Sequence, residues 1–233
     1  MELEICIQSI EELNFCVLNE VKHIEICQAL DMGGLTPSYA FIESAVLSGI
    51  QTNVLIRPRA GNFHYSQSEW EMIVKDIKKA IEIGASGIVF GCLDEWSCLD
   101  KARMKEIRIL TQEQGVEFCC HRAIDVSNNL DDNIRILNEI SVDRVLTSGQ
   151  SPRAIDGIEI LKKMRNKLRQ NIKMLVGSGI RADHIPDFKR IGMDGVHISI
   201  GIRNGLNNDF GFGNDSQIDI HRFHSVRDAI AIR

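Results

Sequence analysis

The sequence predicts a (β/α)8 barrel, and two observations favour this fold class. Short apolar runs of β-prone residues alternate with amphipathic stretches along most of the chain, which is typical of βα units and a parallel sheet. Eight such runs occur in 233 residues, and a barrel of this kind needs a chain of about this size. A doubly wound open sheet is the main alternative, but no G-x-G-x-x-G motif follows the first run. We therefore expect one barrel domain over residues 1–233.

The eight predicted strands are short segments rich in β-branched and other apolar residues. Glycine-marked joints such as IGASG and IGMDG precede two of them, as expected where a helix turns back into the sheet. The predicted strands are Leu3–Ile7, His23–Cys27, Thr52–Arg57, Gly87–Gly91, Val116–His121, Arg144–Ser148, Lys173–Gly177 and Gly195–Ser199.

Three amphipathic helices have recognisable starts. Ser66–Ile83 begins with a Ser-x-x-Glu capping box and continues with apolar residues at spacings of three and four. Asn129–Ile140 carries a similar apolar face. Ser151 and Pro152 have the character of a cap and a first-turn proline, so we expect a third helix to open there.

The C-terminal part is less regular. Residues 201–216 are rich in Gly and Asn, which predicts a loop or a partly ordered excursion. A short final helix is expected near Ser225–Ile232. His221 and His224 are interpreted as its solvated start rather than as a metal pair.

Composition and charge exclude several classes of partner. The chain has 27 Lys and Arg against 32 Asp and Glu, so a general cationic surface for nucleic acid is absent. No apolar run approaches the roughly 20 residues of a membrane span, and the acidic, alternating start is unlike a signal or transit peptide. Seven cysteines, several of them inside strand-like runs, indicate reduced thiols and a cytoplasmic location.

Two cysteines stand at the C-terminal ends of the first two predicted strands, which is the functional end of a barrel. Each follows a glutamate by two positions, so Glu4 and Cys6 share one face, as do Glu25 and Cys27. Neighbouring strands lie about 4.8 Å apart, so both thiols can reach one soft cation, and thiolates select Cu(I) over hard ions. Alternatively, both cysteines are small buried apolar residues, and the glutamates form a buried ion pair with Arg57.

A second group of residues predicts an anion pocket at the same end. Arginine forks bind carboxylate or phosphate, and a Gly-Ser-Gly turn offers backbone N–H groups where many barrels bind phosphate. Alternatively, the arginines form ion pairs with loop carboxylates, and the Gly-Ser-Gly segment is a tight turn that binds no ligand. The candidate anion-binding residues are Arg57, Arg59, Arg122, Ser148, Gly177, Ser178 and Gly179.

Acid–base groups also end the predicted strands. His121 is a candidate general base or metal ligand, and Asp125 either orients it or caps the following helix. Glu25 is a further catalytic candidate, and His197 is a second histidine on the last strand. No lysine stands at a strand C-terminus, which disfavours a Schiff-base aldolase.

Five sequence blocks resemble the CutC copper-homeostasis family. They are IEIC before GGLTPS, IRPR followed by AGNFHYS, HRAID, RVLTSGQ and GSGIR, and the match runs from Leu3 to about Ser199. The resemblance implies a (β/α)8 barrel, a cytoplasmic location, self-association and a role in handling Cu(I). Two departures are visible: His64 stands where the family usually has Cys, and Cys119-Cys120 precedes His121 where it often has Thr-Phe.

Three functions follow as hypotheses. The first is Cu(I) binding, for buffering or delivery, with Cys6 and Cys27 as ligands. The second is an enzyme of unknown reaction that acts on a small anionic metabolite at the barrel mouth. The third is an interaction platform with neither activity. We also expect a homo-oligomer, most simply a dimer, because symmetric dimers are the commonest assemblies.

Overall fold

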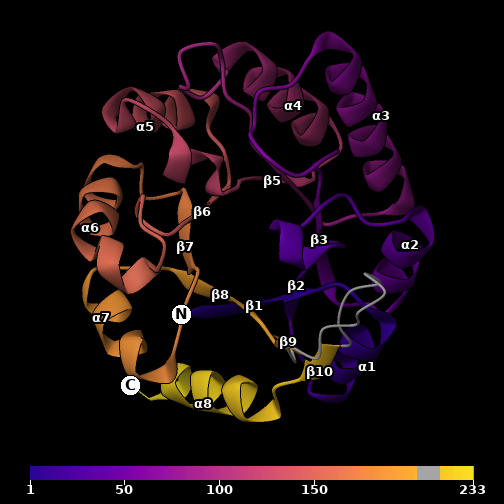
Figure 1. Ribbon diagram of the computed structural model, residues 1–233, viewed down its shortest axis with the longest axis vertical. Helices are drawn as coiled ribbons and strands as arrows, with labels where there is room; N and C mark the ends of the chain where they lie inside the picture. The colour runs from indigo at the N-terminus through magenta and orange to yellow at the C-terminus, as the bar shows by residue number, and fades with distance from the viewer. Residues whose placement is uncertain (204–215, 233) are drawn as a thin grey trace, which may run out of the picture.

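The computed structural model describes residues 1–203 and 216–232, and it confirms the predicted fold class. Eight parallel strands close into a barrel in the order β1-β2-β3-β4-β5-β6-β7-β8 (Figure 1). The strands are β1 (Glu2–Ile7), β2 (His23–Ile26), β3 (Gln51–Leu55), β4 (Gly87–Phe90), β5 (Glu117–Cys120), β6 (Arg144–Thr147), β7 (Lys173–Gly177) and β8 (Gly195–Ser199).

Every predicted strand overlaps an observed one, and the ends differ by no more than two residues. The largest difference is at β3, which ends before Ile56 and Arg57. Arg57 leaves the ladder because its backbone N–H donates to Thr36 Oγ1 and its carbonyl accepts from the Thr36 N–H, both at 2.9 Å. The loop after β2 therefore competes with the neighbouring strand for this residue.

Helices form an outer ring, and α8 closes it beside α7 and α1 (Figure 1). The α-helices are α1 (Ile10–Leu18), α2 (Tyr39–Leu47), α3 (Gln67–Ile83), α4 (Lys101–Glu113), α5 (Leu130–Ile140), α6 (Ile158–Lys167), α7 (Ile185–Arg190) and α8 (Ile220–Ala231). Short 3-10 segments are η1 (Leu30–Met32), η2 (Arg122–Val126), η3 (Ala154–Gly157) and η4 (Ala182–His184).

Two of the three predicted helix starts are confirmed. Ser66 caps α3 through a reciprocal capping box with Glu69, and Asn129 precedes α5. The start predicted at Ser151 and Pro152 is wrong, because α6 begins only at Ile158. The Pro152 carbonyl accepts a bond from Ser178 Oγ at 2.6 Å, so this segment runs across to the loop after β7 before it coils.

The C-terminal prediction needs correction as well. Part of the expected loop is a two-stranded antiparallel sheet of β9 (Gly201–Arg203) and β10 (Ser216–Ile218). The remaining residues of that loop, 204–215, lie outside the described part of the chain. The final helix starts earlier than expected because Asp219 caps it, accepting the Arg222 N–H at 2.9 Å.

Two separate apolar clusters make the core. The larger fills the layer between the strands and the helices. The smaller lies inside the barrel and takes one residue from the region of each of the first seven strands: Cys6, Cys27, Leu55, Val89, Cys119, Leu146 and Leu175. The barrel is therefore filled by side chains up to the level of the two predicted thiol ligands.

A charged layer closes the barrel at the N-terminal ends of the strands. The guanidinium of Arg144, which is 1% exposed, has its Nη2 2.6 Å from Glu2, its Nε 2.9 Å from Glu117 and its Nη1 3.6 Å from Glu4. Lys173 adds an ion pair to Glu2 at 2.5 Å. Buried charges persist only when paired, and here three carboxylates surround one guanidinium.

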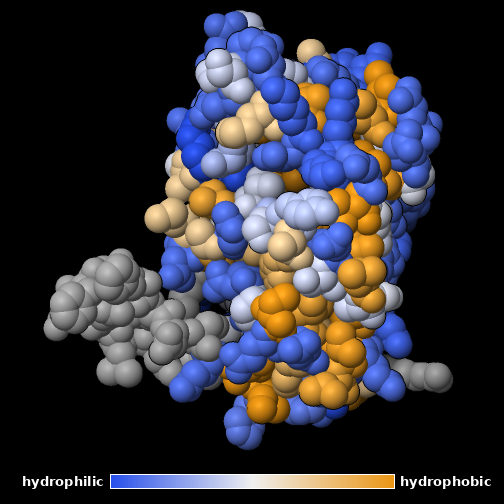
Figure 2. Space-filling view, turned by 90° about the vertical axis from the view of Figure 1, so that its right-hand side faces the viewer, coloured by the Kyte–Doolittle hydropathy of each residue, from blue (hydrophilic) through white to orange (hydrophobic). Residues whose placement is uncertain are grey.

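The outer face over α1, α2 and α3 is mixed in character. Hydrophilic side chains dominate one half of it, and apolar side chains gather in the other half (Figure 2). Val17 and Leu18 on α1 and Leu47 on α2 are exposed apolar residues of this region. Among the described residues, no helix combines the length and the apolar character needed to cross a bilayer.

Candidate functional site

Cys6 and Cys27 meet at the C-terminal mouth of the barrel. Their Sγ atoms lie 3.7 Å apart, and Cys6 Sγ lies 3.9 Å from Glu25 Oε1. The Cys6 Sγ, a carboxylate oxygen of Glu25 and a ring nitrogen of His197 all lie within 4.8 Å of one another. We call Cys6, Cys27, Glu25 and His197 the thiol cluster. One metal ion can be reached by several of these atoms at once.

The loop after β2 packs closely against Cys27 of the thiol cluster. Gly34 has φ +84, and a Cβ there would lie 2.6 Å from Leu55 Cδ2 and 3.4 Å from Cys27 Cβ. Only glycine adopts this backbone and this close approach without strain. The loop after β2 is thereby pressed onto Cys27, which is fully buried.

Burial and neighbouring charges shift the pKa values of three residues of the thiol cluster. The hydrogen bond with Cys27, burial and the nearby carboxylates raise the pKa of Cys6 well above its usual range. Burial, with the Glu4 charge adding to it, raises the pKa of Glu25 to about 7. For His197, burial lowers the pKa, but the carboxylates of Glu25 and Glu4 outweigh it and the net pKa is raised.

Glu4 does not pair with Arg57, so the predicted ion pair of Glu4, Glu25 and Arg57 is wrong. Glu4 lies 2.9 Å from His197 Nδ1 and accepts from Asn53 Nδ2 at 2.7 Å. The Arg57 guanidinium instead donates to backbone carbonyls, which are those of Met32, Gly34 and Gly61. Arg57 therefore stabilises the loops around the mouth and has few donors left for a ligand.

His121 carries a buried nitrogen with no partner. Its Nδ1 accepts the Ala123 N–H at 3.1 Å, and its Nε2 has no hydrogen-bond partner among the described residues. Burial, helped by the charges of Arg57 and Arg122, lowers the pKa of His121 to about 4. The ring is therefore neutral near pH 7, with its proton on Nε2. This state suits a hydrogen-bond donor rather than a base.

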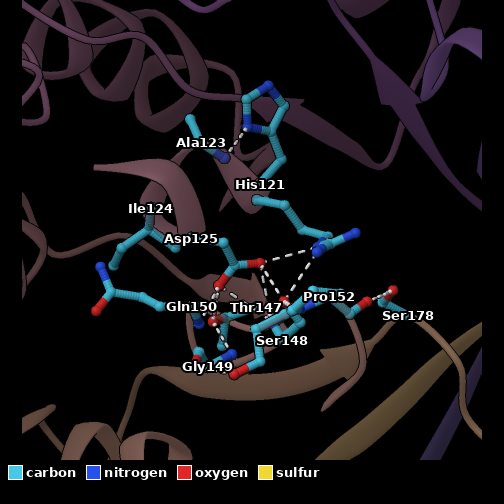
Figure 3. Close-up of polar contacts among 12 residues, drawn as sticks. His121, Ala123, Ile124, Asp125, Thr147, Ser148, Gly149, Gln150, Pro152 and Ser178 are labelled. Carbon is cyan, nitrogen blue, oxygen red and sulfur yellow. Dashed lines mark hydrogen bonds and ion pairs between the residues drawn. The ribbon is translucent and has the colours of Figure 1, made fainter. Parts of the chain in front are cut away.

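Asp125 neither orients His121 nor caps α5. Its carboxylate accepts the Thr147 hydroxyl at 2.5 Å, the Ser148 N–H and Oγ–H at 2.9 Å each, and Nε of Arg122 at 2.8 Å (Figure 3). The His121 ring lies apart from this network, beside Ala123 (Figure 3). Asp125 therefore ties the loop after β5 to the loop after β6.

One cavity of about 410 Å³ opens at the barrel mouth. Most of the predicted site residues line it, namely Cys6, Glu25, Cys27, Arg57, His121, Arg122, Gly177, Ser178 and Gly179, together with His197. Three predicted residues, Arg59, Asp125 and Ser148, are not among its lining residues. Arg59 pairs with Glu69 and donates to the His64 carbonyl, so it fastens the start of α3.

The cavity also contains residues that no sequence pattern indicates. Phe63 lines it and packs on the His121 ring, with centroids 4.9 Å apart. Arg222 reaches it from α8, a helix whose first turn was expected to be solvated. Its position depends on how the ring of helices closes, which local periodicity does not encode.

Comparison with known proteins gives one consistent family. The family model described as the CutC family matches residues 1–202. A CutC family protein of Pasteurella multocida is 34% identical over 201 residues, covering 85% of this chain and 82% of that protein. One from Vibrio parahaemolyticus is 33% identical over 199 residues, covering 84% and 81%.

Solved structures agree with this picture. A CutC protein from Streptococcus agalactiae, whose name assigns it to copper homeostasis, aligns with a TM-score of 0.78 and 28% identity, covering 84% of this chain and 97% of that one. A 3-keto-L-gulonate-6-phosphate decarboxylase from Vibrio cholerae aligns with a TM-score of 0.64 at 11% identity, covering 99% and 97%. At that identity the likeness concerns the fold alone.

Proposed function

Because this chain belongs to the CutC family, we propose that it serves copper homeostasis by holding a Cu(I) ion between the thiolates of Cys6 and Cys27. One observation carries the proposal: two buried sulfur atoms, 3.7 Å apart, face one cavity. Soft thiolates favour Cu(I) over hard cations, so the donor set fits the metal that the family name implies.

His197 supplies a third donor suited to the same ion. Its Nδ1 lies 2.9 Å from Glu4, so Nε2 is the ring nitrogen that we assign to the ion. A carboxylate behind an imidazole is the usual outer-shell arrangement of a metal-binding histidine, because it fixes the ring and its tautomer. Glu4 is itself held by Asn53 at 2.7 Å, so the support is rigid.

Loading the site requires proton release, because a thiol binds metal as the thiolate. The Cys6 thiol donates to Glu25 Oε1 at 3.9 Å, so this carboxylate can accept the Cys6 proton. The negative charge left on the Cys6 thiolate lies close to the imidazole of His197. Binding of Cu(I) is therefore favoured by rising pH.

We place this activity in the cytoplasm, as buffering or delivery of copper by a dimer. All seven cysteines are free, which fits a reducing compartment. The apolar residues exposed on α1 and α2 offer a surface that a second copy would cover. Sedimentation analysis measures the oligomeric state directly.

A Cu(I) titration against the chelator bicinchoninate tests the proposal. We expect the variants Cys6→Ser and Cys27→Ser each to lose more affinity than the roughly 10- to 100-fold that follows loss of an outer-shell partner. Cys120→Ser is the matched control, because Cys120 is equally buried but belongs to the outer core. Equal affinity in all three variants would exclude the thiol site.

A further inference from the structure

Part of the cavity wall away from the thiols is made of hydrogen-bond donors without acceptors. Ser178 and Gly179 follow β7 with φ values of +82 and +65, and within the described chain neither backbone N–H has a hydrogen-bond partner. Such a φ is strained for serine, and strain of this kind gathers where a ligand is bound. The two N–H groups belong to residues that line the cavity.

Arg222 adds a half-buried guanidinium to this wall, and Asp219 is the carboxylate among the described residues whose charge acts on it. Among the described residues its guanidinium has one long contact, from Nη2 to the Ile180 carbonyl at 3.4 Å, and no ion pair within 4.0 Å. That contact places it beside the Ser178–Gly179 turn. A half-buried guanidinium that has no ion pair within 4.0 Å among the described residues is free to hold an anion in the cavity.

Two more donors line the same cavity. Arg122 uses Nε for Asp125 and Nη2 for Ser148, which leaves Nη1 without a partner in the described chain. His121 is 5% exposed, and its Nε2 has no acceptor. The carboxylate on this side, Asp125, is already saturated by its own donors and does not line the cavity.

We propose that this cavity binds a small phosphate-bearing molecule, with the phosphate held by the Ser178 and Gly179 N–H groups and by Arg222. Arg122 and the Nε2–H group of His121 then donate hydrogen bonds to the rest of the molecule. Backbone donors and a guanidinium that converge from different elements match the several oxygens of a phosphate. Barrels frequently use the loops after their seventh and eighth strands in this way. A volume of about 410 Å³ admits a small metabolite.

This site goes beyond copper binding, yet it adjoins the thiol cluster. Gly177 pairs with His197 in the β7–β8 ladder, and a Cβ on Gly177 would lie 3.6 Å from the His197 ring. The two sites therefore share a wall but no donor atom. Each can be removed without taking a ligand from the other.

Calorimetry on the copper-free protein tests the proposal with glycerol 3-phosphate and inorganic phosphate as probes. We expect both to bind, and Arg222→Gln to weaken binding about 10- to 100-fold because a charged hydrogen bond is lost. Arg222→Lys should recover part of the loss. Arg227→Gln is the matched control, since Arg227 lies on the same helix and pairs with Asp228. Ser178→Gly should keep binding, because it retains the N–H group and relieves the strained φ.

Three results would overturn the phosphate site. They are no phosphate binding, equal binding by Arg222→Gln in a protein shown to be folded by circular dichroism, and tighter binding of malonate than of either phosphate. The Cys6→Ser/Cys27→Ser double variant separates this proposal from the copper one. It should bind phosphate normally, whereas Arg222→Gln should bind Cu(I) normally.

Discussion

The Sγ atoms of Cys6 and Cys27 lie 3.7 Å apart although the backbone places the two residues on a diagonal. The strand partner of Cys6 is Glu25, so Cys27 stands one strand across and two residues along. That offset puts the Cα atoms about 8 Å apart. A disulfide needs Cα atoms closer than about 7 Å. The pair is therefore poorly placed to form a disulfide bond.

The first prediction is that Cys6 and Cys27 resist disulfide formation. Treatment of the folded protein with diamide should leave both residues alkylatable after denaturation, because closing the bond requires the barrel strands to shift. Peptide mapping by mass spectrometry measures this. The urea-unfolded chain is the control and should oxidise readily. A Cys6–Cys27 linked peptide from the native protein would contradict the prediction.

The second prediction concerns Glu4 as the support of His197. Glu4→Gln should lower the affinity for Cu(I) by about 10-fold or more, the usual effect of an outer-shell change. The physical reason is that an amide holds the imidazole less firmly than a carboxylate does. Glu117→Gln is the control, because Glu117 also approaches Arg144 but does not contact His197. Similar affinities in both variants would show that His197 is not a ligand.

Removal of the Asp125 charge gives the third prediction. Asp125→Asn should reduce the free energy of unfolding by about 3 kcal/mol, because several donors lose a charged acceptor in a buried place. Urea denaturation monitors the loss. Asp156→Asn should change stability by less than about 1 kcal/mol, since Asp156 forms only an exposed ion pair with Arg153. A stable Asp125→Asn protein would disprove the structural role.

The fourth prediction is a pH dependence that His121 causes. Its pKa is about 4 in the folded protein, against 6.5 for an unperturbed histidine. Between these values the unfolded chain binds a proton that the folded one does not, so stability falls as pH decreases from 6.5 to 4. The slope is about 1.4 kcal/mol per pH unit, or about 3 kcal/mol in total.

His121→Gln tests this dependence by removing the group. Its stability relative to the parent should rise as pH falls below 6.5 and stay constant above pH 7. Denaturation curves at a series of pH values give the difference. A difference that does not change with pH would mean that the pKa of His121 is the same in the folded and unfolded states.

The strands and the thiol pair could be predicted because they follow from local chemistry. Side-chain alternation fixes which face Cys6 and Cys27 share, and chain order in a parallel barrel makes their strands neighbours. Cys27 stands two residues beyond the strand partner of Cys6, and the two side chains close the remaining distance to 3.7 Å between their Sγ atoms. The late start of α6 depends on a contact distant in sequence, between Pro152 and Ser178, whereas the early start of α8 comes from the local cap at Asp219.

The partners of the charged residues could not be predicted in the same way. Arg57 binds three loop carbonyls, and no pattern of residue types encodes where backbone oxygens converge. Arg144, the first residue of β6, is 1% exposed. Barrel closure brings it under the carboxylates of Glu2 and Glu4, and only the assembled ring creates that environment.

The guanidinium of Arg144 and the carboxylates around it fill the barrel at the N-terminal ends of the strands. If the sulfur atoms hold an ion as proposed, the cavity is the opening that the described residues leave to it. The ion would then enter and leave through the same opening. On the proposed role, a copper donor and a copper acceptor would have to bind one after the other, because both cannot occupy this opening at once.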